Sequence, residues 1–269
     1  MSHPESLTLQ GVRKVFFPGT ANEVVALNSI DLQIPAGQFV TVIGSNGAGK
    51  STLLNAVAGT FPLTSGSVRI GSQDVTKQGE HVRSRLIGRV FQDPRAGTAP
   101  GMSIEENLAL ALMRSHRSRL RRGVTKARRG QMRDMLTGLG MGLEDRLKAQ
   151  VNKLSGGQRQ AMSLLMATVD EPSVLLLDEH TAALDPKVAG TIMEVTGRIV
   201  EERGLTTLMI THNMEIALRY GDRLIMMHAG RVVLDLDGPQ KSQLKVPDLV
   251  EKFHQVAGQA LTSDRMLLE

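Results

Sequence analysis

The chain has 269 residues, 41% of them hydrophobic and 22% charged, a composition typical of globular proteins with one large domain or two small ones. It contains no cysteine, which excludes disulfide bonds and thiolate metal sites, and no apolar run is long enough to span a membrane. Aromatic residues make up 3%, which argues against a platform for single-stranded nucleic acid, so we expect no nucleic-acid partner. The first ten residues lack the basic and apolar regions of a secretory signal, and we expect none.

The net charge of +5 arises in one segment of the chain. Between Arg114 and Arg133 there are nine basic residues and no acidic ones, whereas acidic residues outnumber basic ones elsewhere. Such a segment can contact phosphate, anionic lipid or an acidic partner, or it can be a solvated helical hairpin. The sequence leaves these alternatives open.

Short strands and turns are predicted for the first part of the chain. The expected strands lie at Leu7–Val15, Val24–Leu27, Ile30–Ile34, Phe39–Ile43, Ser67–Ile70 and Leu86–Phe91. A glycine-rich turn over 44–49 leads into a helix at Ser51–Ala58, which Gly59 ends.

Helices dominate the middle of the chain, and strands return toward its end. Helices are expected at Ile104–Leu112, Gln158–Val169 and Pro186–Arg203, and the basic segment and Gln131–Leu139 continue the helical character of the first. Strands are expected at Val174–Leu177, Leu205–Ile210, Leu224–Met227 and Arg231–Leu236. The run at Val174–Leu177 is wholly apolar, which is typical of a central parallel strand. Alternating strands and helices at both ends, with a helical block between them, predict an α/β core with an inserted helical subdomain.

The glycine-rich turn matches the phosphate-binding pattern G-x-x-x-x-G-K-[ST] at every fixed position of residues 44–51. An apolar strand precedes it and a helix follows, as this motif requires. Its glycines allow successive N–H groups to point at one anion, and the helix start adds its positive dipole end. The Lys50 ammonium can reach the β- and γ-phosphates, and the Ser51 hydroxyl can ligate Mg²⁺.

Two carboxylates end the apolar run at Val174–Leu177. Asp178 and Glu179 are expected at the carboxyl end of a central strand, where ligands bind in open α/β sheets. Asp178 would hold Mg²⁺ through water, and Glu179 would orient and polarise the attacking water. Two acids after a strand are by themselves more often a turn or a helix cap, but together with Lys50 and Ser51 they favour phosphoryl-transfer chemistry.

The string LSGGQ at residues 154–158 resembles the signature of ATP-binding-cassette (ABC) proteins and stands between the two phosphate motifs, as in that family. It can also be a helix N-terminus, with Ser155 and Gln158 as a capping box. The resemblance covers about residues 5–237. ATP would then contact Gly44, Ser45, Asn46, Gly47, Ala48, Gly49, Lys50, Ser51 and Thr52, and from the signature Ser155, Gly156, Gly157 and Gln158.

Further family motifs follow in order. Gln92 resembles the glutamine that senses Mg²⁺ and the attacking water, and His212 resembles the switch histidine that contacts the γ-phosphate. Asp185 resembles the residue that communicates between two ATP sites. Phe16 resembles the aromatic that stacks on adenine, with Phe17 as its competitor. The catalytic residues implied are Glu179, His212, Gln92 and Lys50; ATP would also contact Phe16 and Asp185; Mg²⁺ would be held by Ser51, Gln92 and Asp178.

One position departs from the family pattern. His180 follows Glu179, where many members have proline. The departure leaves both carboxylates in place, and we assign His180 no catalytic role.

The resemblance implies a P-loop NTPase core of the ABC ATPase type, with an N-terminal antiparallel β-subdomain and an inserted helical subdomain. One ABC ATPase domain is expected over 1–269: a nucleotide-binding core at 1–92 and 166–240, a helical signature subdomain at 93–165, and a C-terminal tail at 241–269. Members work as head-to-tail dimers with ATP between the phosphate loop of one chain and the signature of the other. A second copy of this chain is the simplest partner.

The resemblance also implies a transport role. The subunit would hydrolyse ATP at the cytoplasmic face of the plasma membrane, peripherally, docked on an integral-membrane permease through Asp93–Asn107. The stretches Asp178–Asp185 and Ile104–Leu108 resemble those of bacterial uptake cassettes, so we expect a substrate-binding protein in the complex and import of an amino acid or similar small polar solute. The basic segment would then lie beside anionic lipid headgroups. The alternatives are an exporter or lipoprotein-release cassette, and a non-transport ABC ATPase acting on nucleic acid or ribosomes.

Overall fold

The computed structural model describes residues 4–113 and 123–255. Its centre is a six-stranded sheet with the strand order β10-β9-β3-β8-β7-β6, in which β9 and β10 are antiparallel and the other neighbouring pairs are parallel. The strands are β3 (Phe39–Gly44), β6 (Ile87–Val90), β7 (Val174–Asp178), β8 (Thr206–Ile210), β9 (Arg223–His228) and β10 (Arg231–Leu236). The apolar run predicted for a central strand is β7, and its first four residues are buried by layers on both faces.

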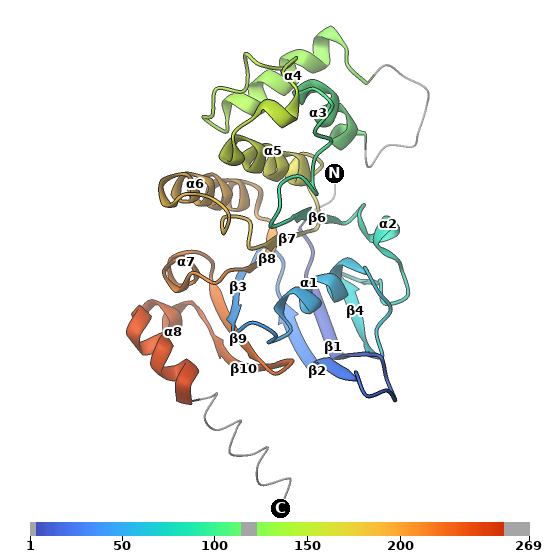
Figure 1. Ribbon diagram of the computed structural model, residues 1–269, viewed down its shortest axis with the longest axis vertical. Helices are drawn as coiled ribbons and strands as arrows, with labels where there is room; N and C mark the ends of the chain where they lie inside the picture. Colours follow the sequence, from blue (N-terminus) through green and yellow to red (C-terminus); the bar gives the residue numbers. More distant parts are fainter. Residues whose placement is uncertain (1–3, 114–122, 256–269) are drawn as a thin grey trace, which may run out of the picture.

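A four-stranded antiparallel sheet lies beside the larger one, in the order β2-β1-β4-β5 (Figure 1). Its strands are β1 (Leu7–Phe16), β2 (Val24–Ile34), β4 (Ser65–Ile70) and β5 (Gln73–Asp74). The two strands predicted within 24–34 are one strand. The predicted break between them is instead a set of register shifts between β1 and β2, next to Ser29, whose φ is 56°.

Helix α1 (Lys50–Ala58) lies between the two sheets and carries the residues that join them. Leu53 and Leu54 are completely buried, in one apolar cluster with Leu7 from the small sheet and Val42 from the large one. The helix is therefore fixed from both sides, and its N-terminus is held at the end of β3.

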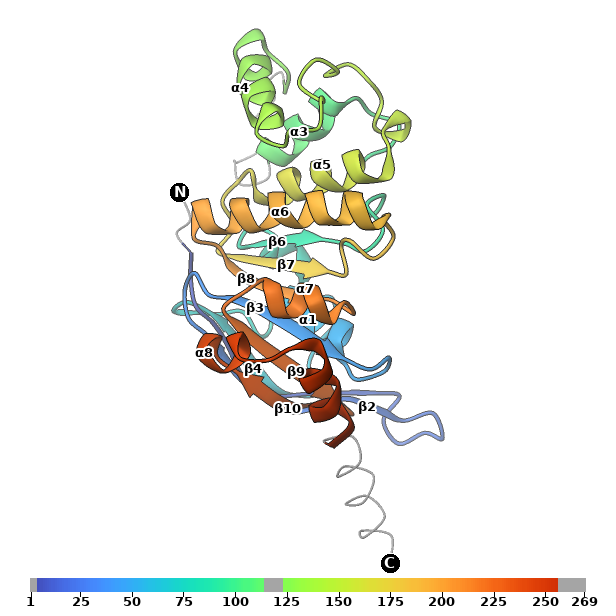
Figure 2. The ribbon, with the colours of Figure 1, turned by 90° about the vertical axis from the view of Figure 1, so that its left-hand side faces the viewer.

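The helical block covers the opposite face of the large sheet. It consists of α3 (Ile104–Leu112), α4 (Lys126–Thr137), the 3-10 turn η1 (Val151–Lys153), α5 (Gly156–Thr168) and α6 (Pro186–Arg203). Leu175 and Leu177 of β7 face this block, whereas Val174 and Leu176 face α1. Figures 1 and 2 show α3, α4 and α5 gathered at one end of the molecule. Because α5 continues past residue 165, the expected subdomain boundary falls inside a helix, and the division stays a prediction.

Short helices complete the structure. They are α2 (Glu80–Arg83), α7 (Met214–Arg219), α8 (Gly238–Ser242) and a further helix over 246–255. The last one belongs to the tail that the sequence predicts as weakly helical, and Leu249 fixes it to the sheet in a cluster with Leu224 and Met226. Within the described part of the chain, no helix combines the length and the hydropathy that a membrane crossing requires.

Candidate nucleotide-binding site

Four parallel strands end at the same edge of the large sheet, and each is followed by a predicted site motif. The phosphate loop follows β3, Gln92 follows β6, Asp178 and Glu179 stand at the end of β7, and His212 follows β8. The carboxyl ends of parallel strands form the crevice in which ligands bind in open α/β sheets. The topology thus gathers motifs that are more than 160 residues apart in the sequence.

The phosphate loop needs its glycines for backbone geometry. Gly44 and Gly49 have φ of 149° and 99°, and a Cβ atom there would lie 2.3 Å from the Met227 carbonyl oxygen and 2.5 Å from that of Ala26. Gly49 is also the N-cap of α1, and no side chain caps that helix. The first N–H groups of α1 are therefore available to an anion, which the positive end of the helix dipole also attracts.

Lys50 lies in the loop with only 5% of its surface exposed. Its Nζ donates hydrogen bonds to the carbonyl oxygens of Gly44 at 2.8 Å and Ser45 at 2.9 Å. An ammonium has three donors, so one remains for a phosphate oxygen. Burial lowers the pKa of Lys50, and the carboxylates of Glu179 and Asp178 partly offset the shift.

A cavity of about 520 Å³ opens in front of the loop. One wall is apolar and formed by Phe16, Val24, Val25 and Ala26; the other residues lining it are Asn46, Gly47, Ala48, Gly49, Lys50, Ser51, Thr52, Glu179 and His212. Of the two phenylalanines that the sequence offers, Phe16 lines this cavity, while Phe17 is 66% exposed and does not. Sequence reasoning missed Val24 and Val25, two exposed residues, because nothing in a strand-like sequence marks a residue as part of a cavity wall.

Glu179 and His212, which both line this cavity, touch each other. His212 Nε2 lies 2.5 Å from Glu179 Oε1, and the side chains are 44% and 11% exposed respectively. Glu179 has a φ of 46°, a conformation that costs free energy in non-glycine residues and is concentrated at functional sites. Its backbone N–H donates to the Ile210 carbonyl oxygen at 3.1 Å, so β8 holds the carboxylate in place.

Asp178 is held by a residue that sequence reasoning missed. Arg89 of β6 donates from Nη2 to Asn55 Oδ1 at 2.8 Å and to Asp178 Oδ2 at 3.4 Å. The sequence could have pointed to Arg89, because it is a charged residue within an otherwise apolar strand. The cavity wall, as the described residues form it, includes neither Asp178 nor Gln92, so the predicted Mg²⁺ ligands are not all assembled around it.

The signature residues form the N-terminus of α5, on the helical block. Ser155 Oγ accepts from the Gln158 N–H at 3.2 Å, and Gln158 Oε1 accepts from the Ser155 N–H at 3.2 Å, which is the predicted capping box. Together with Gly156, these residues lie outside the wall of the cavity. Asp185 caps α6 by accepting from the Val188 N–H at 3.1 Å.

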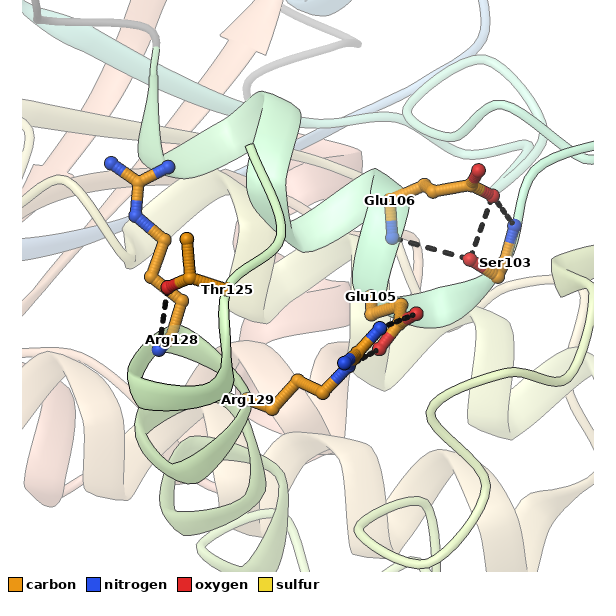
Figure 3. Close-up of polar contacts among 6 residues, drawn as sticks. All are labelled: Ser103, Glu105, Glu106, Thr125, Arg128 and Arg129. Atoms are coloured by element: carbon orange, nitrogen blue, oxygen red, sulfur yellow. Dashed lines mark hydrogen bonds and ion pairs between the residues drawn. The ribbon is translucent and has the colours of Figure 1, made fainter. Parts of the chain in front are cut away.

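The basic segment is described only in part, since residues 114–122 lie outside the described residues. Figure 3 shows what its remainder does at the start of α4. Arg129 donates from Nε and Nη2 to the Glu105 carboxylate at 2.7 and 3.0 Å, joining α4 to α3. This hydrogen bonding lowers the pKa of Glu105. The Arg128 N–H donates to Thr125 Oγ1, which caps α4. At least one of the nine basic residues therefore holds two helices together.

Comparison with known proteins agrees with this geometry. Residues 27–182 match the family model described as ABC transporter. The chain is 46% identical over 235 residues to the tyrosine transport ATP-binding protein of Clostridioides difficile, covering 87% of this chain and 92% of that protein. It is 35% identical over 232 residues to the methionine import ATP-binding protein MetN 1 of Bacillus licheniformis, covering 84% and 66%. A solved dimeric ATP-binding cassette in a post-hydrolysis state, bound to ADP and Pi, matches with a TM-score of 0.74 at 29% identity, covering 86% of this chain and 98% of that one.

Proposed function

The chain belongs to the ABC transporter family, as an ATP-hydrolysing subunit that drives solute transport, and on this premise we propose how its site works and what it serves. Two copies close head to tail over two ATP molecules, and the closure drives a separate permease that imports an amino acid or a similar small polar solute. One observation carries this proposal. A single cavity is lined by the phosphate loop, by Phe16 and by the contacting pair Glu179 and His212.

Each group has a role that its geometry supports. The uncapped N–H groups of α1 and the spare donor of Lys50 bind the β- and γ-phosphates. Phe16 stacks on the adenine, with Val24 and Val25 forming the rest of the apolar wall. Glu179 orients and polarises the attacking water, and His212 leaves the carboxylate to contact the γ-phosphate. Catalysis here is positioning plus charge stabilisation, because the transferred phosphoryl group needs little covalent help.

The donor atoms of three predicted residues also suit a magnesium ion. Ser51, Gln92 and Asp178 offer hydroxyl, amide and carboxylate oxygens, the hard ligands that Mg²⁺ prefers. When bound, the ion would neutralise charge on the phosphate oxygens. Arg89 keeps the Asp178 carboxylate in position for this, through a contact of 3.4 Å. Gln92 is exposed at the end of β6 and must move toward the loop to take part.

The signature takes part through a second copy. Ser155 and its neighbours lie outside the cavity wall of their own chain, on an exposed helix N-terminus that is well placed to meet another molecule. Asp185 at the start of α6 is exposed too. Its neighbours line a further hollow of about 620 Å³, which Glu179 and His212 also line. A partner that inserts there would contact the catalytic pair directly.

The transport partners follow from family membership. We assign the permease contact to Asp93–Asn107, whose loop lies between β6 and α3, and we expect a substrate-binding protein in the complex. The subunit would then lie at the cytoplasmic face of the membrane without crossing it. The amino-acid cargo is supported by the relatives named for tyrosine and methionine.

The test of the site uses Glu179→Gln. In the presence of ATP and Mg²⁺ we expect this variant to bind ATP, to stop turning over and to sediment as a dimer, because the neutral amide cannot polarise water. Lys50→Ala is the control that should lose nucleotide affinity and remain a monomer. Turnover at the wild-type rate in Glu179→Gln would remove that residue from its role, and a persistent monomer would contradict the head-to-tail dimer.

The test of the partners is affinity purification from the native cell in mild detergent, followed by mass spectrometry. Recovery of a polytopic membrane protein together with a substrate-binding protein would support import. Recovery of ribosomal or DNA-repair proteins without any permease would overturn the transport assignment of the partners.

A further inference from the structure

The loop assigned to the permease is tied to the segment that precedes the signature. The N–H groups of Ile104 and Glu105 donate to the carbonyl oxygens of Ala149 and Leu147, both at 3.0 Å. In return, the N–H groups of Val151 and Asn152 donate to the carbonyl oxygens of Met102 and Pro100, also at 3.0 Å. Residues 147–154, which we call the strap, therefore run along residues 100–105 with paired backbones.

The strap ends at the signature itself. It passes through the 3-10 turn Val151–Lys153, reaches the buried Leu154, and continues directly into Ser155, the N-cap of α5. A shift of the 100–105 segment is thus linked to Ser155 through a few residues of hydrogen-bonded backbone. This link transmits a shift only if the turn at its end is stiff.

Arg159 supplies that stiffness. From the first turn of α5 its guanidinium reaches back over the turn, donating from Nε to the Val151 carbonyl oxygen at 3.4 Å and from Nη2 to those of Asn152 and Leu154 at 3.2 Å. Its own N–H donates to the Ser155 carbonyl oxygen at 2.9 Å. The planar, rigid fork of an arginine donates from separate nitrogens and can hold carbonyls that lie apart, whereas the donors of a lysine all leave one nitrogen at the end of a flexible chain.

We propose that Arg159 is a positioning residue for Ser155, which fixes the strap so that the signature presents its helix N-terminus to the ATP bound by the partner copy. The proposal rests on the head-to-tail dimer proposed above. It makes Arg159 matter for closure of the dimer and not for binding of ATP by one chain, because Arg159 belongs to the helical block and the cavity wall lies elsewhere.

The experiment measures the dimer in a Glu179→Gln background, where ATP is bound but not hydrolysed. Arg159→Ala, Arg159→Lys and the matched control Arg146→Ala, an exposed arginine of the same block, are each added to it. With ATP and Mg²⁺ present, sedimentation over a range of concentrations gives the dimer dissociation constant. Nucleotide affinity at low protein concentration and the unfolding midpoint are measured alongside.

We expect Arg159→Ala to raise the dimer dissociation constant about tenfold, Arg159→Lys to raise it less, and Arg146→Ala to leave it unchanged. Nucleotide affinity of the monomer should be the same in all variants. An equally tight dimer in Arg159→Ala would overturn the proposal while the dimer itself stands. So would a dimer weakened only in proportion to lost nucleotide affinity. If Arg159→Ala does not fold, Arg159→Lys decides by the same criteria. Absence of any ATP-dependent dimer in the Glu179→Gln parent would overturn the proposed function, and this inference with it.

Discussion

Helices α1 and α5 both begin in glycine-rich turns, yet their N-termini are completed in opposite ways. At α1 the N-cap is Gly49, and no side chain satisfies the first N–H groups. At α5 the N-cap Ser155 and Gln158 satisfy each other in a capping box. The first N-terminus lies between two sheets, with Lys50 buried beside it, whereas Ser155 is exposed on the helical block.

This difference shows which half of the ATP site one chain can build alone. The α1 end leaves donors unsatisfied inside a packed framework, which is a preformed anion site. At the α5 end the capping box satisfies the N–H groups of Ser155 and Gln158, while those of Gly156 and Gly157 have no intrahelical acceptor and lie at an exposed helix N-terminus, where a partner's phosphate can reach them. Substitutions at α1 should therefore affect folding and nucleotide binding, while substitutions at α5 should affect mainly the dimer.

Adding one methyl group to each turn should have very different effects on stability. At Gly49, where φ is 99°, a Cβ atom would lie 2.5 Å from the Ala26 carbonyl oxygen, whereas at Gly156 the nearest atom is Leu184 Cδ2 at 3.4 Å. We expect Gly49→Ala to lower the free energy of unfolding by about 4 kcal/mol, from backbone strain plus a collision with main chain. Gly156→Ala should change it by less than about 0.5 kcal/mol.

The measurements are urea unfolding and nucleotide titration of the two single variants. Gly49→Ala should also lose ATP binding, and Gly156→Ala should keep it in the monomer. Equal effects of the two substitutions on unfolding would show that the two turns do not differ in the way proposed.

A second prediction concerns the buried histidine that directly follows Glu179, after β7. His180 is fully enclosed, and burial lowers its pKa to about 4 from an ordinary value of 6.5. Its Nε2 lies 3.0 Å from Thr196 Oγ1, whose own proton goes to the Ile192 carbonyl oxygen, so Nε2 carries the hydrogen and donates. The folded protein therefore holds His180 neutral at neutral pH.

The stability of the protein should depend on pH through this histidine. Between pH 6.5 and 4 the unfolded chain binds a proton at this position and the folded chain does not, so stability falls as the pH falls. His180 should remove about 3 kcal/mol of stability between pH 7 and pH 4, and His180→Gln should abolish that part of the acid sensitivity. Thr196→Val, which keeps the buried imidazole, is the control that should retain it. Parallel unfolding curves for wild type and His180→Gln across this range would contradict the assignment.

The sequence predicts the features whose signals are local. Helix α6 runs from Pro186 to Arg203 as predicted, because Asp185 caps it, proline occupies its first turn and Gly204 ends it with a φ of 58°. The phosphate loop is equally local, since its spacing and its flanking strand and helix lie within twenty residues. The four strand ends meet because parallel strands end at the same edge of a sheet, so this feature can be predicted without knowing how their side chains pack.

Features that depend on contacts between distant segments could not be predicted. Val24 and Val25 line the nucleotide cavity only because β2 lies beside the phosphate loop in space. The contact between Arg89 and Asp178 joins residues 89 positions apart. Register and packing decide these cases, and neither can be read from one sequence.

The smallest expected effect concerns how α5 is seated against the loop that leads to α3. A Cβ atom on Gly97 would lie 2.5 Å from Ser163 Oγ, which is buried in α5 and makes no hydrogen bond to the described residues. We expect Gly97→Ala to cost about 1 kcal/mol of unfolding free energy through this overlap. Ser163→Ala should be neutral or slightly stabilising, because it removes an unsatisfied buried hydroxyl.

The double variant decides whether the two residues act on each other. With the Ser163 hydroxyl gone, the nearest atom to the new methyl group is the Cβ of residue 163 at 3.6 Å, an ordinary contact, so Ser163→Ala should cancel most of the cost of Gly97→Ala. The expected coupling energy from urea unfolding is about 1 kcal/mol. Gly101→Ala, in the same loop with open space around it, is the matched control and should be close to neutral. Strictly additive effects would mean that the loop moves away from α5 instead of resting on it. The signature helix would then not rest on Gly97, and its links to the loop assigned to the permease would be the strap and the packing of α3 on α5.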